Sequence, residues 1–175
     1  VDDVFSSVNC NNSGIIGNIL TNDLINNHSF NSSDVIITVL NNPSSYITID
    51  NNGNITVTAG VPIGVYQLEY RICEVIKPTN CDTAFITITI IDDTPPVFLG
   101  TLPTLTIECP NVPVFDTPNV MDTCSNVDLT YVDDTTPGSC GQSYVIIRTW
   151  TATDASGNSS TTTQTIIVQD TTAPV

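Results

Sequence analysis

Several carboxylates stand where they could bind a hard cation. The linker and second half of the chain supply Asp92, Asp93, Asp122, Asp154 and Asn158. Calcium binds six to eight oxygen atoms in proteins, which carboxylate, amide and backbone carbonyl groups provide. Carboxylates brought together without a lysine or arginine repel one another unless a cation lies among them. The pattern predicts a calcium site, and the alternative is that these are turn residues, for which Asp and Asn are favoured anyway.

A comparable group of oxygen ligands occurs at the beginning of the chain. It also combines adjacent aspartates with Asn and Asp further along the sequence, so we expect it to bind calcium in the same way. Asp170 would begin a third group of this kind. The candidate ligands at the beginning of the chain are Asp2, Asp3, Asn22, Asp23 and Glu74.

Six cysteines are the other residues with evident chemistry. Together with the scarcity of lysine, they favour a secreted or cell-surface protein with disulfides over a cytosolic one. Cys73 and Cys81 flank a single predicted hairpin loop, so we expect them to pair. Cys109 and Cys140 fall at the same end of a predicted sandwich and are expected to form a second disulfide, although six cysteines allow 15 pairings.

The charge of the chain is strongly negative and evenly spread. Ten acidic and two basic residues precede Thr94, and eight acidic residues and one basic residue follow it, which gives −8 and −7 and a total of −15. Nucleic acids and anionic membranes are bound through Lys and Arg, so neither is expected as a partner. No apolar stretch approaches the roughly 18–20 residues of a membrane span, so no membrane insertion is expected.

Catalysis is not expected from this sequence. The one histidine, His28, lies in a polar Asn/Ser stretch without an evident nucleophile beside it. No nucleophile elbow or phosphate-binding loop occurs. The three glutamates are a poor basis for a glycosidase pair, because Glu69 is expected on an outer strand face, Glu74 in a loop and Glu108 beside a cysteine.

Short runs that alternate apolar and polar residues, separated by Asn, Gly, Pro and Asp turns, predict an all-β protein of two tandem Ig-like β-sandwich domains. In the second domain Trp150 shares a face with Arg148, which places the indole in the core and the arginine stem beside it.

Sandwich topology gathers the linker aspartates and the loops of Asp122 and Asp154 at one end of that domain. Strands are expected near 3–8, 15–21, 34–40, 45–50, 54–59, 64–73 and 82–91 in domain 1–93, and near 104–109, 113–120, 127–133, 143–153 and 160–169 in domain 94–175. The inward residues of strands 64–73 and 82–91 are expected to be Tyr66, Leu68, Tyr70, Ile72, Ala84, Ile86, Ile88 and Ile90.

The chain also repeats its linker sequence. Residues 91–97 read IDDTPPV and residues 169–175 read QDTTAPV, 78 positions later (170 − 92). A domain-sized period of this kind predicts a tandem array, of which the chain would be a piece. The short linker between the domains contains Pro95 and Pro96, whose fixed φ limits its backbone freedom.

At the level of motifs the chain resembles known surface proteins. Residues 107–110 (IECP), 121–124 (MDTC) and 148–158 (RTWTATDASGN) resemble the HYR-like immunoglobulin-fold repeats of bacterial surface proteins. Residues 17–23 (GNILTND) and 73–81 (CEVIKPTNC) resemble the cadherin-like repeats found beside them. Together they are similar to the giant secreted adhesins of the Bacteroidetes, including those of gliding flavobacteria. The resemblance implies an extracellular, adhesive role, with neighbouring repeats of the same polypeptide and a surface polysaccharide or the substratum as partners.

This resemblance bears on the last two cysteines, Cys10 and Cys124. Related repeats usually carry a cysteine at the position of Ser156, so Cys124 lacks its usual partner here. Sandwich topology places Cys10 at the end of the first domain and Cys124 at the end of the second domain that face the linker. We expect a bridge between them, which requires Cα atoms within about 7 Å. The alternatives are two unpaired thiols or a pair between Cys109 and Cys124.

The expected function is that of a stiff, disulfide-bonded stalk in a secreted surface adhesin, with calcium as a possible rigidifying ion. This expectation depends on the family resemblance, because fold by itself does not imply function. The alternative is a carbohydrate-binding module in which exposed Tyr46, Tyr131 and Tyr144 contact sugar. The threonine-rich outer faces suit solvent-exposed strands, although a flat threonine array could also bind ice or chitin.

Overall fold

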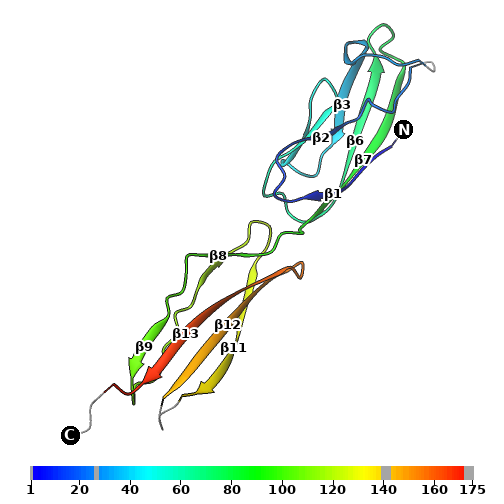
Figure 1. Cartoon of the computed structure of the whole chain (residues 1–175). Coiled ribbons are helices and arrows are strands. Elements are labelled where there is room, and N and C mark those ends of the chain that lie inside the picture. The colour runs from blue at the N-terminus through cyan, green and yellow to red at the C-terminus, as the bar shows by residue number, and fades with distance from the viewer. Residues whose placement is uncertain (1, 26–27, 139–142, 172–175) are drawn as a thin grey trace. The chain divides into compact units, whose positions relative to one another are not determined.

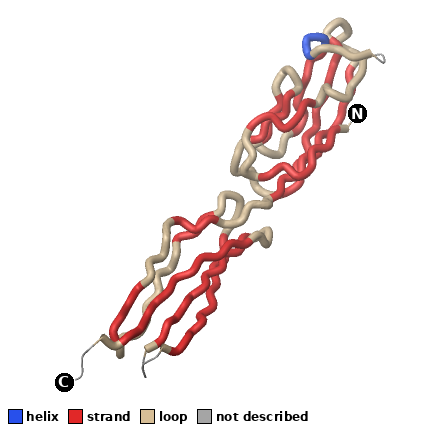
Figure 2. Tube along the Cα trace, viewed as in Figure 1, coloured by secondary structure: helices blue, strands red, loops and turns tan. Residues whose placement is uncertain are grey.

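The computed structural model describes residues 2–25, 28–138 and 143–171 of the 175-residue chain. It divides into two compact units, Val1–Asp92 and Asp93–Val175, hereafter the first and the second unit (Figure 1). Regular structure is almost entirely β-strand (Figure 2), and the described residues contain one short 3-10 helix, η1 (Ser32–Asp34). No helix in this part of the chain has the length and apolar sequence needed to cross a membrane.

Two sheets form the β-sandwich of the first unit. The larger sheet has the strand order β1-β7-β6-β3 and the smaller has the order β2-β5-β4. Neighbouring strands are antiparallel except β1 and β7, which run parallel. The strands are β1 (Asp3–Asn9), β2 (Gly14–Asn18), β3 (Val35–Asn41), β4 (Ile47–Ile49), β5 (Asn54–Val57), β6 (Gly64–Glu74) and β7 (Cys81–Ile91).

Alternating apolar residues build the core of the first unit, as the period-two pattern predicts. Between them, outward residues such as Arg71 and Phe85 are exposed. Gly17 on β2 is required by packing, because a Cβ atom there would overlap the ring of Phe5. Of the predicted inward residues, Leu68, Tyr70, Ala84, Ile86, Ile88 and Ile90 are confirmed as buried, and Tyr66 and Ile72 are half-buried. The smaller sheet contributes Ile47, Ile55 and Val57.

The second unit has a four-stranded sheet of order β11-β12-β13-β9 and a two-stranded sheet of β10 and β8. Strands β9 and β13 run parallel, and the other neighbours are antiparallel. Among the residues of this unit that the structure describes, few apolar ones are buried, namely Pro96, Pro118, Trp150, Ala152, Ile166 and Val168. The strands are β8 (Val97–Leu99), β9 (Leu105–Glu108), β10 (Asn119–Met121), β11 (Val127–Pro137), β12 (Tyr144–Asp154) and β13 (Ser159–Gln169).

One predicted strand of the second unit is largely wrong. Residues 113–120 were expected to form a strand, but only Asn119–Met121 does so. Pro113 and Pro118 have no N–H to donate to a sheet ladder, and Val112 and Val114 on either side of Pro113 are 79% and 76% exposed. The sequence reading also missed Val97–Leu99 as a strand.

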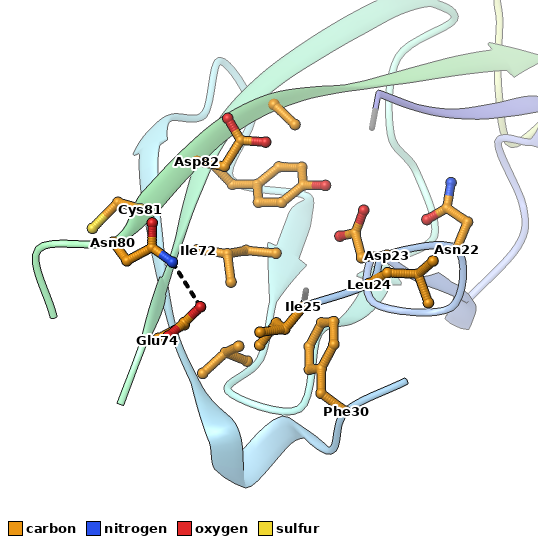
Figure 3. A pocket seen from close by; sticks show the side chains of 13 residues that line it. Asn22, Asp23, Leu24, Ile25, Phe30, Ile72, Glu74, Asn80, Cys81 and Asp82 are labelled. Atoms are coloured by element: carbon orange, nitrogen blue, oxygen red, sulfur yellow. Dashed lines mark hydrogen bonds between the residues drawn. The ribbon is translucent and has the colours of Figure 1, made fainter. Parts of the chain in front are cut away.

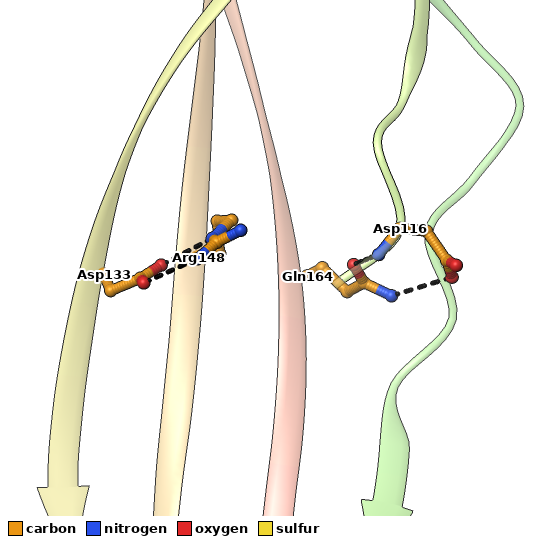
Figure 4. Close-up of polar contacts among 4 residues, drawn as sticks. All are labelled: Asp116, Asp133, Arg148 and Gln164. Carbon is orange, nitrogen blue, oxygen red and sulfur yellow. Dashed lines mark hydrogen bonds and ion pairs between the residues drawn. The ribbon is translucent and has the colours of Figure 1, made fainter. Parts of the chain in front are cut away.

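A buried glutamine fastens this irregular segment to the large sheet. The Gln164 side chain is 1% exposed. Its Oε1 accepts a hydrogen bond from the backbone N–H of Asp116 at 3.0 Å, and its Nε2 donates to Asp116 Oδ2 at 3.2 Å (Figure 4). Because a buried amide is costly unless it is hydrogen-bonded, this pair holds Asp116 in place without a strand ladder.

Arg148 packs among three aromatic rings of the second unit. Its guanidinium lies 4.2 Å from the ring centre of Phe115, 3.7 Å from that of Tyr131 and 5.3 Å from that of Trp150. Its Nε and Nη2 each donate to a carboxylate oxygen of Asp133 at 2.7 Å (Figure 4). The guanidinium holds the pKa of Asp133 below its usual value. The position of Arg148 beside Trp150 is as the sequence predicts.

Candidate functional site

Two of the predicted calcium ligands lie together in the second unit. Asp122 follows β10 and Asp154 ends β12, and carboxylate oxygens of the two side chains lie within 4.8 Å of each other. Their loops are also joined, since the backbone N–H of Ala155 donates to Ser125 Oγ at 3.3 Å. The structure therefore brings Asp122 and Asp154 close enough to share one cation.

The Asp122 carboxylate also shapes its own loop. Its Oδ1 accepts hydrogen bonds from the backbone N–H groups of Cys124 at 2.8 Å and Ser125 at 2.9 Å. An aspartate that bonds the backbone two residues on is a common turn former. The other oxygen, Oδ2, makes no hydrogen bond within the described part of the chain. A cation could therefore bind Oδ2 without breaking the turn.

Asp154 is the hub of a five-residue turn between β12 and β13. Its Oδ1 accepts from the backbone N–H groups of Ser156 and Asn158, and its Oδ2 accepts from Asn158 Nδ2, all at 2.8–2.9 Å. Burial raises the pKa of Asp154, but the hydrogen bonds from Asn158, Ser156 and Gly157 outweigh it and lower the pKa below its usual value. Asp154 is therefore ionised at neutral pH, as a cation ligand must be.

The same turn occurs in the first unit at residues 50–54, none of which is a predicted calcium ligand. Asp50 Oδ1 accepts from the backbone N–H groups of Asn52 and Asn54, and its Oδ2 accepts from Asn54 Nδ2. The glycines of the two turns, Gly53 and Gly157, have φ of 82° and 91°, in the left-handed region that favours glycine. The sequence signal is Asp-x-x-Gly-Asn, present twice. The turn alone therefore accounts for Asp154 and Asn158, and sequence reasoning missed it.

The linker aspartates stand at the boundary of the units. Asp92 is the last residue of the first unit and Asp93 the first residue of the second. Their part in a calcium site stays a prediction, as does that of Asp170 beyond β13.

In the first unit the predicted ligands are engaged by the fold. Asp3 is 6% exposed, and its Oδ2 accepts a hydrogen bond from the hydroxyl of Tyr70 at 3.0 Å. Asp2 Oδ1 accepts from the backbone N–H of Phe85 at 2.9 Å. Within the described part of this unit, no three Asp, Glu, His or Cys side chains place ligand atoms within 4.8 Å of one another. The hydrogen bonds of Asp2 and Asp3 thus hold the beginning of β1 beside β6 and β7, and they require no cation.

A cavity of about 350 Å³ opens beside β6 and β7 (Figure 3). Its apolar wall includes Phe30 and Ile72, and its polar lining includes Asp23, Glu74 and Asp82. Glu74 Oε1 accepts a hydrogen bond from Asn80 Nδ2 at 2.6 Å across its rim. Of the predicted ligands, Asn22, Asp23 and Glu74 line the cavity, whereas Asp2 and Asp3 do not.

Burial of Asp3 predicts a pH dependence that an asparagine would remove. Burial raises the pKa of Asp3, hydrogen bonds from Tyr70 and Asn22 lower it, nearby Asp23 raises it, and the net pKa lies above its usual 3.8. The folded state therefore binds this proton more tightly, so the contribution of Asp3 to stability falls as pH rises through the raised pKa. Asp3→Asn should raise the free energy of unfolding at pH 7 in chelator and do so less below pH 4. Urea denaturation at both pH values measures this, and an equal effect at both would contradict it.

The structure tests part of the predicted disulfide pairing. Cys73 and Cys81 form the predicted disulfide, with an S–S distance of 2.01 Å at the loop end of the β6–β7 hairpin. Cys10 and Cys124 both take part in disulfides, and the bridge predicted between them stays a prediction. Cys140 lies outside the described residues, so its predicted pairing with Cys109 stays a prediction too.

Two of the tyrosines named for sugar binding, Tyr131 and Tyr144, lie far apart along the sheet of the second unit. Tyr131 packs against Trp150 with ring centres 5.1 Å apart, and the guanidinium of Arg148 lies over the Tyr131 ring. Tyr144 begins β12, six residues before Trp150, the residue that pairs with Tyr131, and this is about 20 Å along the strand. Tyr46 belongs to the first unit. This arrangement gives no support to a carbohydrate-binding cluster.

No known protein family and no curated protein matches this sequence. Several solved structures resemble the fold. Drosophila N-cadherin EC1–3 matches with 16% identity and a TM-score of 0.47 over 96% of this chain and 63% of that chain. Mouse protocadherin-24 EC1–3 matches with 18% identity and a TM-score of 0.42 over 98% and 69%. The human desmocollin-1 ectodomain matches with 16% identity and a TM-score of 0.41, and this chain spans 41% of its length. Likeness at this level concerns the fold and says nothing of what the chain binds.

Proposed function

We propose that this chain is a two-repeat segment of a secreted, cell-surface adhesin, in which each sandwich acts as a non-catalytic spacer. The observation that carries the proposal is the parallel pairing of β1 with β7 and of β9 with β13. Because an early strand and the last strand run the same way in each unit, the chain enters at one end of the sandwich and leaves at the other. Units with this topology can be strung in series, and a disulfide-bonded pair suits an extracellular location.

The finer assignment follows the sequence resemblance. The motifs of the second unit and their neighbours in the first are similar to the repeats of flavobacterial gliding adhesins such as SprB. In this proposal the partners are adjacent repeats of the same polypeptide, and the adhesin grips a surface polysaccharide or the substratum. The load that such a filament transmits would pass through both units.

Calcium is proposed to stiffen the linker. Asp122 and Asp154 would hold the ion, together with Asp92, Asp93 and Asn158. The donor set fits, since Asp122 and Asp154 approach within 4.8 Å and each carboxylate keeps unused lone pairs beside its turn hydrogen bonds. A cation would supply charge neutralisation there, and a Cys10–Cys124 bridge would be the second tie between the units.

The repeated turn offers a matched test of this calcium site. Asp50→Ala and Asp154→Ala each remove the same hydrogen bonds, so without calcium each should destabilise its own unit by about 1–2 kcal/mol. Calcium should raise the melting temperature of the second unit in the wild type and in Asp50→Ala, but not in Asp154→Ala. The fluorescence of Trp150, the single tryptophan, reports unfolding of the second unit.

The turn-preserving variant Asp154→Asn separates charge from loop geometry. It should keep most of the turn and still lose the calcium effect. Equal calcium responses in wild type, Asp154→Asn and Asp154→Ala would overturn the site, as would no response in the wild type. The spacer role would then depend on the prolines and disulfides alone.

A further inference from the structure

The outer face of β12 and β13 in the second unit is uncharged. Because Trp150 and Gln164 point into the sandwich, strand alternation directs their odd-numbered neighbours outward. All of these outward residues are described, and none of them is acidic or basic. They are Val145, Ile147, Thr149, Thr151 and Thr153 on β12 and Ser159, Thr161, Thr163, Thr165 and Ile167 on β13. We call this surface the neutral face.

The strand register arranges the neutral face in rows. Thr151 pairs with Thr161 on one side and with Thr130 of β11 on the other. Thr149 likewise lies between Thr163 and Val132. Ile147 in the face is 37% exposed, and Val132 beside it on β11 is 73% exposed, so methyl groups accompany the hydroxyls there. Figure 1 shows β11, β12 and β13 side by side as the longest strands of this unit.

This face stands out against the charge of the molecule. The chain carries −15, and the acidic residues of the same sheet surface, Asp128, Asp134 and Glu108, lie on the flanking strands β11 and β9. Two copies of so acidic a protein repel each other over most of their surfaces. Contact through the neutral face brings no charged residue of β12 or β13 against another, which favours a second copy as its occupant.

We propose that the neutral face packs against the neutral face of a second copy of this chain. Two-fold symmetry makes such a contact self-complementary, since both copies present the same rows of threonine side chains. Two sheets packed face to face lie about 10 Å apart, which leaves room for interdigitated threonine and valine side chains. This inference is independent of calcium and goes beyond the role of each unit as a spacer.

The size of the face sets the strength of the contact. Each of its two strands has 11 residues, so the face measures about 37 Å by about 10 Å, or roughly 350 Å² per copy. The pair would bury roughly 700 Å², which is below the usual size of specific interfaces. A single contact should therefore be weak. Contacts repeated along two filaments would add through effective concentration and hold the filaments side by side.

Sedimentation velocity tests the proposal on the chain as it stands. In chelator, which removes any cation bridging, the chain should show a monomer–dimer equilibrium that strengthens at least several-fold between about 0.02 M and about 0.5 M NaCl, because salt screens the repulsion but not the neutral contact. A chain that stays monomeric at high concentration in both salts would overturn the proposal.

Matched charge variants locate the contact. Thr151→Asp with Thr163→Asp places like charges within the neutral face and should abolish dimerisation. Thr38→Asp with Thr87→Asp adds the same charge to outward positions of β3 and β7 in the first unit and should leave most of it intact. Equal loss in both variants would contradict the assignment of the contact to this face.

A crosslinking measurement covers the case in which the aspartate variant unfolds. Thr161→Cys should give an oxidised dimer far faster than Thr87→Cys, because only Thr161 belongs to the neutral face. Equal rates would overturn the proposal. Retention of a monomeric chain on insoluble chitin, lost in Thr151→Asp with Thr163→Asp, would assign the face to a polysaccharide and likewise overturn it.

Discussion

Replacing Arg148 by alanine is expected to lower the free energy of unfolding of the second unit by about 2–3 kcal/mol. The guanidinium contacts Phe115, Tyr131 and Trp150 and makes a two-pronged ion pair with Asp133. Alanine removes all of these contacts from a unit with few buried apolar residues. The midpoint of thermal unfolding, followed by Trp150 fluorescence, should fall by about 10–20 °C for a unit of this size.

Arg71 provides the matched control for this experiment. It lies on the exposed outer face of β6, so Arg71→Ala should change stability by no more than about 0.5 kcal/mol. Arg148→Lys keeps the charge but loses the planar fork and its stacking, so it should fall between wild type and alanine. If Arg148→Ala were as harmless as Arg71→Ala, the cluster would be a surface arrangement without energetic weight.

Removing the Cys73–Cys81 disulfide should destabilise the first unit by about 2.5 kcal/mol, from the loop entropy of a closed ring of this size. The double variant Cys73→Ser with Cys81→Ser avoids an unpaired thiol and leaves the other cysteines untouched. Chemical denaturation followed by circular dichroism should show the loss in the first unit. Trp150 fluorescence should report unchanged unfolding of the second unit, and a shift of both transitions would contradict the local account.

Local patterns made much of the fold predictable. The alternation in strands β6 and β7 identified their inward faces, because each residue's direction follows from its neighbours. The Cys73–Cys81 pair followed from the same hairpin. Arg148 was placed beside Trp150 by counting two residues along one strand. In each case the information lies within a few residues of sequence.

Partners from distant segments were not predictable in the same way. Asp133 meets Arg148 because β11 pairs with β12 in one particular register, and the predicted strand ended at residue 133, although the real strand continues through Pro137. Phe115 comes from the segment that was expected to be a strand. Neither contact has a local signature, because register and loop path are set by the whole unit.

The acidic residues show a different limit. The high acidic content indicated cation binding. However, Asp154 and Asn158 are already joined by hydrogen bonds that form their own turn. The informative signal was the recurrence of Asp-x-x-Gly-Asn at residues 50–54. Charge density alone could not separate a turn aspartate from a ligand, whereas the comparison of two identical turns can.

The parallel pairing of β1 with β7 has a mechanical consequence. When tension pulls the beginning of β1 and the end of β7 apart, the two strands are drawn past each other along their length. The hydrogen bonds between them lie across the direction of pulling, so they must rupture together and not one after another. The same geometry holds for β9 and β13. Each unit therefore contains a shear joint, which resists sudden force better than strands that separate one hydrogen bond at a time.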